Sequence, residues 1–175
     1  MKKIISQILK NHLLQLCIIC VLGTWYHAMF FALNDVMKIA DSFAYLQMSH
    51  YLWNFSSQWL WNGWFWFIYS LPIAVINIFT SSDFFAAKIV NLILLNISAI
   101  LLWKISKNYL SGLYSLLVVV LFFLSPTLLH FNIHILTENI YIPLFLGLFL
   151  LLIKFIKKPS VSSTIVVACM IGLMY

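Results

Sequence analysis

The chain has 175 residues, of which 64% are apolar and 8% are charged, and its formal net charge is +6. A soluble domain of ordinary composition carries about 25% charged residues, so this chain has too few to cover a water-exposed surface. The composition therefore excludes an ordinary soluble domain and predicts an all-α, multi-span membrane protein. The lysines occur in small groups beside apolar runs rather than in one basic patch, which argues against nucleic acid as a partner.

Four apolar runs are long enough to predict complete spans, at residues 13–33, 84–103, 113–129 and 135–153. A fifth run, at residues 161–175, is shorter than the roughly 20 residues required for crossing. We therefore expect a truncated chain that forms a single transmembrane module over residues 1–175. Residues 34–83 are mixed in polarity and predict an outer loop that carries interfacial helices.

Residues 64–80 are ambiguous, because they are apolar but contain Pro72. If this segment does not cross, eight of the ten lysines fall on the side of the N-terminus and two fall on the other side. If it crosses, the division becomes four and six, against the preference of lysines for the cytoplasmic side. The segment is thus predicted to be a juxtamembrane or re-entrant helix on the outer face. The N-terminus is then cytoplasmic, and in a bacterium the protein would lie in the plasma (inner) membrane.

The chain has four acidic residues, and this topology places all of them on the outer side: Asp35, Asp41, Asp83 and Glu138. Glu138 opens an apolar span at membrane depth, where a carboxylate is costly and usually functional. An acid at a helix N-terminus also gains from the helix dipole, so a functional and a structural interpretation of Glu138 both stay open.

Asp41 and Tyr45 lie in a segment, residues 41–53, whose apolar residues recur at helical spacing. Four positions apart, the two side chains would share one face of a helix. A carboxylate beside a phenol at a lipid–water boundary can accept a proton from an alcohol, or hold a divalent cation that polarises a phosphate. The alternative is an ordinary acid at the start of a helix.

His130, His134 and Glu138 follow one another at intervals of four, which would place them along one side of a continuous helix. Such spacing can bind a metal ion, although interfacial histidines more often form hydrogen bonds in the headgroup layer. No cofactor is assigned on this basis, and a divalent cation stays an alternative. The other histidines, His50 among them, are expected to have no partner nearby.

Three motifs occur in order along the chain: Asp41-Ser-Phe-Ala-Tyr45 after the first span, Ser125-Pro126 near the end of the third, and Thr137-Glu138 at the start of the fourth. In order and spacing they resemble the N-terminal part of the GT-C glycosyltransferases. The closest branch is the protein mannosyltransferase and lipid A aminoarabinose transferase group (family 39-like). The resemblance implies a GT-C-like N-terminal module in the membrane.

The activity implied by this resemblance is transfer of a sugar from a polyprenyl-phosphate donor to a glycan, lipid or protein acceptor at the outer face. It would place the main catalytic role on Asp41, as a general base for the acceptor hydroxyl, with Glu138 lining the same cavity. Tyr45, Asp35 and His134 are the further candidates for that cavity.

The sequence departs from the family pattern at Ser42, where a second acid is often found. The basic residues expected to hold the lipid phosphate would come later than residue 175, so the fragment is expected to be inactive alone. Two alternatives stay open: a non-enzymatic membrane protein, such as part of a transporter or an assembly subunit, and a surface-polysaccharide polymerase or ligase. The transferase interpretation requires Asp41 and Glu138 to converge on one outward-facing cavity.

Overall fold

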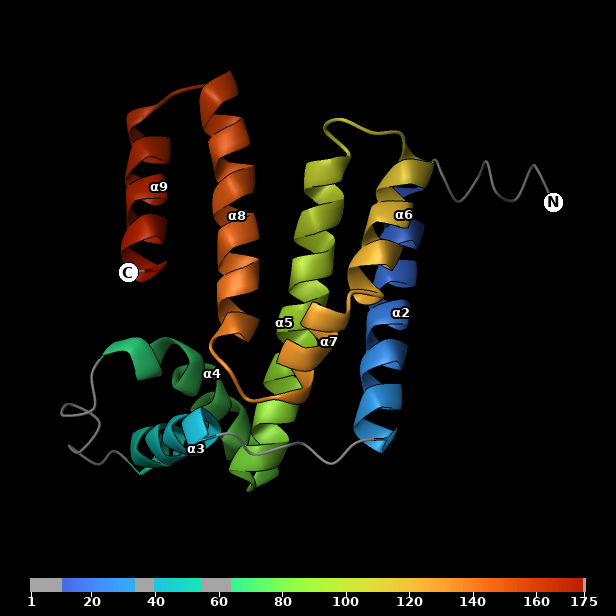
Figure 1. Cartoon of the computed structure of the whole chain (residues 1–175). Coiled ribbons are helices and arrows are strands. Elements are labelled where there is room, and N and C mark those ends of the chain that lie inside the picture. Colours follow the sequence, from blue (N-terminus) through green and yellow to red (C-terminus); the bar gives the residue numbers. More distant parts are fainter. Residues whose placement is uncertain (1–10, 34–39, 55–63, 175) are drawn as a thin grey trace.

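The computed structural model describes residues 11–33, 40–54 and 64–174. Within these ranges every regular element is an α-helix, as the composition predicts. The helices, shown in Figure 1, are α2 (His12–Leu33), α3 (Ala40–Trp53), α4 (Trp64–Thr80), α5 (Asp83–Ser106), α6 (Gly112–Phe123), α7 (Pro126–Ile133), α8 (Glu138–Lys157) and α9 (Val161–Met174).

Helix α5 is the centre of the packing. It contacts α2, α4, α6 and α8, and α9 packs along α8. Figure 1 shows α2, α5, α6, α8 and α9 standing roughly along one direction, with α5 between α2 and α8. Several buried residues of α5 are small (Ala86, Ala87, Ser98 and Ala99), which lets neighbouring helices approach its backbone closely.

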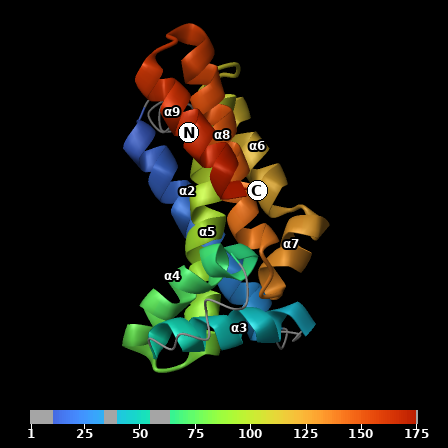
Figure 2. The same ribbon diagram turned by 90° about the vertical axis from the view of Figure 1, so that its left-hand side faces the viewer.

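Helices α3 and α4 pack against each other at one end of this bundle. α3 lies across the end at which α2 finishes and α5 begins, and α4 slants toward the start of α5 without reaching its opposite end (Figures 1 and 2). We call this the α3 end of the bundle. α4 has the bounds predicted for the juxtamembrane segment at residues 64–80. Its position relative to a membrane stays a prediction.

Two described helices, α5 and α8, are long and apolar enough to cross a membrane. α6 and α7 would make a third crossing if they are counted as one bent span. The apolar stretches Leu14–Met29 and Val161–Met174, in α2 and α9, are shorter. The structure therefore contains two or three candidate spans among its described residues.

The segment predicted as a span at residues 113–129 is not one straight helix, because it breaks and bends by 52° between α6 and α7. Ser125 is extended at the break, and its Oγ accepts a hydrogen bond from the amide of Leu128. Pro126 follows at the first position of α7, where its missing N–H costs nothing but where it cannot continue α6.

Lysines gather at the end of the bundle opposite to α3. Two connections meet there, and the lysines lie in them or in the last turns of α5 and α8 that lead into them: Lys104, Lys107, Lys154, Lys157 and Lys158. The two connections touch through the Lys157 ammonium, which donates to Asn108 Oδ1 at 3.3 Å. The described acids Asp83 and Glu138 begin α5 and α8 instead, toward the α3 end. Five of the six lysines in the described residues thus lie away from these acids, while Lys88 lies near Asp83 in α5.

Candidate functional site

Helix α3 is joined to the connection between α7 and α8 by two hydrogen bonds. Ser42 Oγ donates to the carbonyl of Ile135 at 3.1 Å, and the Tyr45 hydroxyl donates to Thr137 Oγ1 at 3.2 Å. Ser42 and Tyr45 are both buried. Thr137 makes no side-chain capping bond to α8, so its hydroxyl serves the contact with α3 instead.

These bonds bring two predicted motifs together, because Glu138 directly follows Thr137 and Asp41 precedes Tyr45 by one turn of α3. Glu138 is exposed at the start of α8. The side chain of Asp41 is not among those that the structure describes, and Asp35 lies outside the described residues. The two helix starts are therefore shown to be neighbours, while convergence of the two carboxylates stays a prediction.

Behind this contact lies a buried network of amides and a phenol. The Tyr69 hydroxyl donates to Asn91 Oδ1, and the Asn91 amide donates to the carbonyls of Asn132 and His134 at 3.2 and 3.1 Å. Burial raises the pKa of Tyr69 above its usual value of 10.0, so at neutral pH the phenol is a proton donor.

Asn139, in the first turn of α8, completes this network from the other side. Its amide donates to the carbonyls of Phe131 and His134, both at 2.9 Å. Carbonyls in a helix break have no partner in the helix ladder, and in apolar surroundings each unpaired one is costly. The two asparagines therefore stabilise the break between α7 and α8.

The predicted alignment of His130, His134 and Glu138 along one helix is wrong, because α7 ends at Ile133 and α8 begins only at Glu138. His134 is buried, with Nδ1 at 2.7 Å from the His130 carbonyl, and the two imidazole rings are 4.4 Å apart. Among the described residues, no group of three His, Cys, Asp or Glu side chains is placed to hold a metal ion.

A second polar cluster surrounds Asp83, at the start of α5. Its carboxylate accepts from Asn77 Nδ2 at 2.7 Å and from Ser49 Oγ at 3.3 Å, and His50 Nδ1 lies 3.7 Å away. The expectation that His50 has no partner is therefore wrong. Because Asp83 joins α3, α4 and α5, its evident role is to hold the α3 end together.

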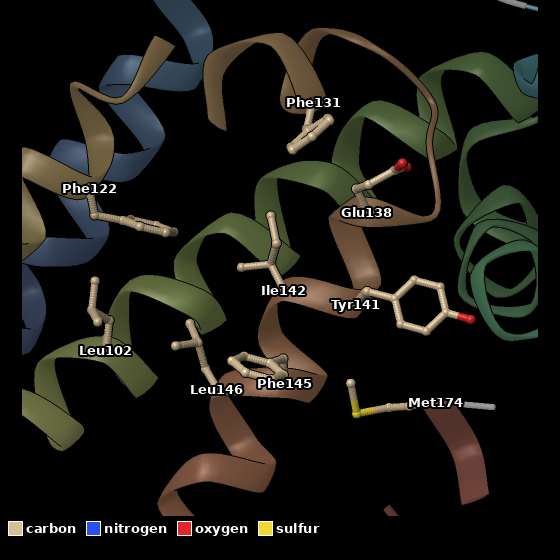
Figure 3. A pocket seen from close by; sticks show the side chains of 9 residues that line it. All are labelled: Leu102, Phe122, Phe131, Glu138, Tyr141, Ile142, Phe145, Leu146 and Met174. Carbon is tan, nitrogen blue, oxygen red and sulfur yellow. The ribbon is translucent and has the colours of Figure 1, made fainter. Parts of the chain in front are cut away.

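A pocket of about 380 Å³ lies on the side of α8 that faces α5, α6, α7 and α9 (Figure 3). α8 contributes Glu138, Tyr141, Ile142, Phe145 and Leu146. The remaining lining residues are Leu102, Phe122, Phe131 and Met174. Figure 3 shows Phe131 and Glu138 toward one end of the pocket, with the Glu138 carboxylate directed away from Ile142, and Leu102 and Leu146 toward the other end.

Comparison with protein-family models, with curated proteins and with solved structures finds no match to this chain. The functional argument therefore depends on the residues of the site themselves.

The two asparagines that donate to the carbonyl of His134 were not predicted as site residues from the sequence. Asn91 and Asn139 each interrupt an apolar run, and a polar residue within such a run usually forms hydrogen bonds to another helix or to backbone. That signal marks the two positions as significant. It does not reveal that both amides donate to the carbonyl of His134.

Proposed function

We propose that this chain is a module of a GT-C-type membrane glycosyltransferase that moves a sugar from a polyprenyl-phosphate donor to an acceptor at the outer membrane face. The observation that carries the proposal is the Tyr45–Thr137 hydrogen bond, which joins two motifs of the resemblance. Asp41 lies one helical turn from one partner, and Glu138 directly follows the other. Two acids whose helices meet in this way can act on one substrate.

The proposed topology is a multi-span bundle with its lysine end in the cytoplasm and its α3 end outside. The gathering of lysines from two connections at one end supports this orientation, because lysines favour cytoplasmic loops. Helices α3 and α4 would then lie at the outer boundary of the membrane, where a membrane-anchored donor and a polar acceptor can both reach the site.

In the proposed reaction Asp41 accepts the proton of the acceptor hydroxyl. The acceptor oxygen forms a bond to C1 of the sugar, and the bond between C1 and the donor phosphate oxygen breaks, so the lipid phosphate leaves with the bonding electrons. Glu138 would orient the acceptor from the facing helix. Tyr45, which donates a hydrogen bond to Thr137, would keep α3 at a constant distance from α8. These steps do not require a divalent cation, which stays an alternative partner of the phosphate.

The test measures transfer of radiolabelled sugar from polyprenyl phosphate in membranes that contain the full-length protein. Asp41→Asn should abolish transfer without changing the amount of inserted protein, whereas Asp35→Asn, a matched change in the preceding segment, should leave transfer intact. Loss of transfer in the Asp35 variant alone would move the role of base to that residue. Full turnover in both variants would overturn the proposed chemistry.

A non-enzymatic membrane protein is the second candidate, favoured by the extent to which polar groups near Glu138 bond to one another. Ser42, Asn91 and Asn139 each stabilise backbone carbonyls near the helix break. A transporter or an assembly subunit requires such bonds but no catalytic base, so Asp41→Asn would leave its function unchanged. A surface-polysaccharide polymerase or ligase would share the lipid-linked donor and would differ in its acceptor.

A further inference from the structure

The lysine end of the bundle brings positive charge from two connections onto one surface (Figure 1). The Lys157 ammonium lies 3.3 Å from Asn108 Oδ1, so the α8 side and the α5 side of this surface are in contact. In the described part of the chain the carboxylates of Asp83 and Glu138 begin α5 and α8 at the opposite end. The five lysines of the lysine end therefore repel one another, and a bound anion would relieve that repulsion. They are Lys104, Lys107, Lys154, Lys157 and Lys158.

Two of these ammonium groups are held in place by neighbouring side chains. Lys107 Nζ lies 5.0 Å from the centre of the Trp103 ring, and the buried Trp103 donates its indole N–H to Gln15 at 3.2 Å. Lys157 is held by its hydrogen bond to Asn108. Side chains that are already ordered lose less conformational entropy when a ligand binds, so these two lysines suit an anion better than freely moving ones.

Exposed aromatic and aliphatic side chains lie next to the lysines. Tyr109 is 69% exposed and is followed by exposed Leu110, and Ile156, 79% exposed, directly precedes Lys157 on α8. A small soluble anion would leave these hydrocarbon groups in water. A phospholipid can cover them with its acyl chains while its phosphate meets the ammonium groups in charge-assisted hydrogen bonds.

We propose that the lysine end binds one anionic phospholipid, with its phosphate between the α5–α6 and α8–α9 connections and its acyl chains against the apolar residues that flank the lysines. This goes beyond the proposed transferase activity, because the surface lies at the opposite end of the bundle from Tyr45 and Glu138. Lipid binding and sugar transfer can therefore succeed or fail independently of each other.

The experiment uses the whole 175-residue chain in micelles of a neutral maltoside detergent, and native mass spectrometry counts the lipids bound to each protein. The probes are phosphatidylglycerol, which is anionic, and phosphatidylcholine, which has the same chains and a phosphate but no net charge. The first phosphatidylglycerol should bind about ten-fold or more tightly than phosphatidylcholine. Salt at roughly 0.5 M should remove most of this preference.

Two double variants test whether both connections contribute to one site. Lys104→Gln with Lys107→Gln, and Lys154→Gln with Lys157→Gln, each remove two positive charges. Each should weaken phosphatidylglycerol binding about ten-fold or more and leave phosphatidylcholine binding unchanged. Lys88→Gln removes a lysine near the start of α5, at the other end of the bundle, and this matched control should change neither affinity.

Equal affinity for the two lipids would overturn the proposal. So would a loss confined to one double variant, because the site would then not lie between the connections, or a comparable loss in Lys88→Gln, because total charge alone would then explain binding. Displacement of the lipid by an equal concentration of inorganic phosphate would show a phosphate site rather than a lipid site. Lys154 and Lys157 are exposed, so their variant decides the question even if the change at Lys107 disturbs the fold.

Discussion

The Tyr45 hydroxyl donates a 3.2 Å hydrogen bond to Thr137 Oγ1, although 92 positions separate the two residues in the sequence. Together with the Ser42 bond to the Ile135 carbonyl, it holds α3 against the segment that precedes α8. The bond is partly buried, so it is weakly exposed to competition from water. This bond therefore couples the position of α3 to the position of the start of α8.

Tyr45→Phe removes this bond while keeping the ring, and it should lower the free energy of unfolding by about 0.5–1.5 kcal/mol. Unfolding by SDS from maltoside micelles provides the measurement, and a double-mutant cycle with Thr137→Val isolates the pair. Tyr51→Phe is the matched control, because the Tyr51 hydroxyl accepts an exposed hydrogen bond from Gln47 within α3 itself. A coupling energy near zero between positions 45 and 137 would show that the contact contributes nothing.

Asn91→Leu should destabilise the protein more strongly, by about 1–3 kcal/mol for each carbonyl that loses its donor. The Asn132 carbonyl loses its side-chain donor, whereas the His134 carbonyl keeps the hydrogen bond from Asn139; both lost bonds are buried. Asn54→Ala removes an amide whose bonds to His50 are exposed and local, so it should change stability little. The same unfolding assay compares the two variants, and equal effects would argue against a structural role for the buried network.

Gly23 lies where α2 packs against α5 and α6. A Cβ at this position would lie 2.6 Å from Asn96 Oδ1 and 3.0 Å from Phe123 Cζ. Asn96 cannot turn away freely, because its amide donates to the Leu92 carbonyl at 2.9 Å. Gly23→Ala should therefore lower stability by about 1–3 kcal/mol despite the better helix propensity of alanine.

Gly172→Ala provides the control for the change at Gly23, since nothing lies within 4 Å of a Cβ at this position of α9. Here the propensity term acts alone, and stability should stay level or rise by up to about 1 kcal/mol. If Gly23→Ala were also neutral, α2 and α5 would have room to separate at this point.

The regular elements of the fold were predictable because they depend on local pattern. Helical spacing of apolar residues indicated α3, and α4 has the predicted bounds. The break at Ser125-Pro126 was visible as a motif, but hydropathy reports only that a segment is apolar. It does not report that the helix changes direction by 52°.

Residues of the candidate site could be predicted from the sequence, but their arrangement in space could not. Tyr45 was singled out because it lies four positions after Asp41, and Glu138 because it is an acid that opens an apolar run. Their setting depends on long-range partners such as Thr137, whose hydroxyl bonds to α3 rather than capping α8. Such a choice between a local cap and a distant donor is made by tertiary packing, which no local pattern contains.

The buried phenol of Tyr69 should make stability fall at alkaline pH. Burial raises its pKa in the folded chain, while in the unfolded chain the group keeps its ordinary pKa of 10.0. Above that pH the unfolded state releases a proton that the folded state retains, so unfolding becomes more favourable as pH rises. Tyr69→Phe removes this contribution. Unfolding measured between about pH 8 and pH 11 should show a steeper loss in the parent than in the variant, and parallel profiles would contradict the assignment.

The proposed topology predicts that Gln47 and Tyr109 face opposite sides of the membrane. Both are exposed, one on α3 and the other in the connection between α5 and α6. In a background without the free cysteines Cys17, Cys20 and Cys169, a membrane-impermeant maleimide should label Gln47→Cys from outside intact cells.

Tyr109→Cys should react only after the membrane is opened, and so should Lys158→Cys, because the connection that carries it touches the same end of the bundle through Lys157 and Asn108. If α4 crossed the membrane, α5 would run the other way, and positions 47 and 109 would be labelled from the same side. That result would place the lysines outside and the start of α8 in the cytoplasm. A lipid-linked sugar donor in the outer leaflet would then have no access to Glu138, so the orientation and the transferase proposal depend on the same labelling pattern.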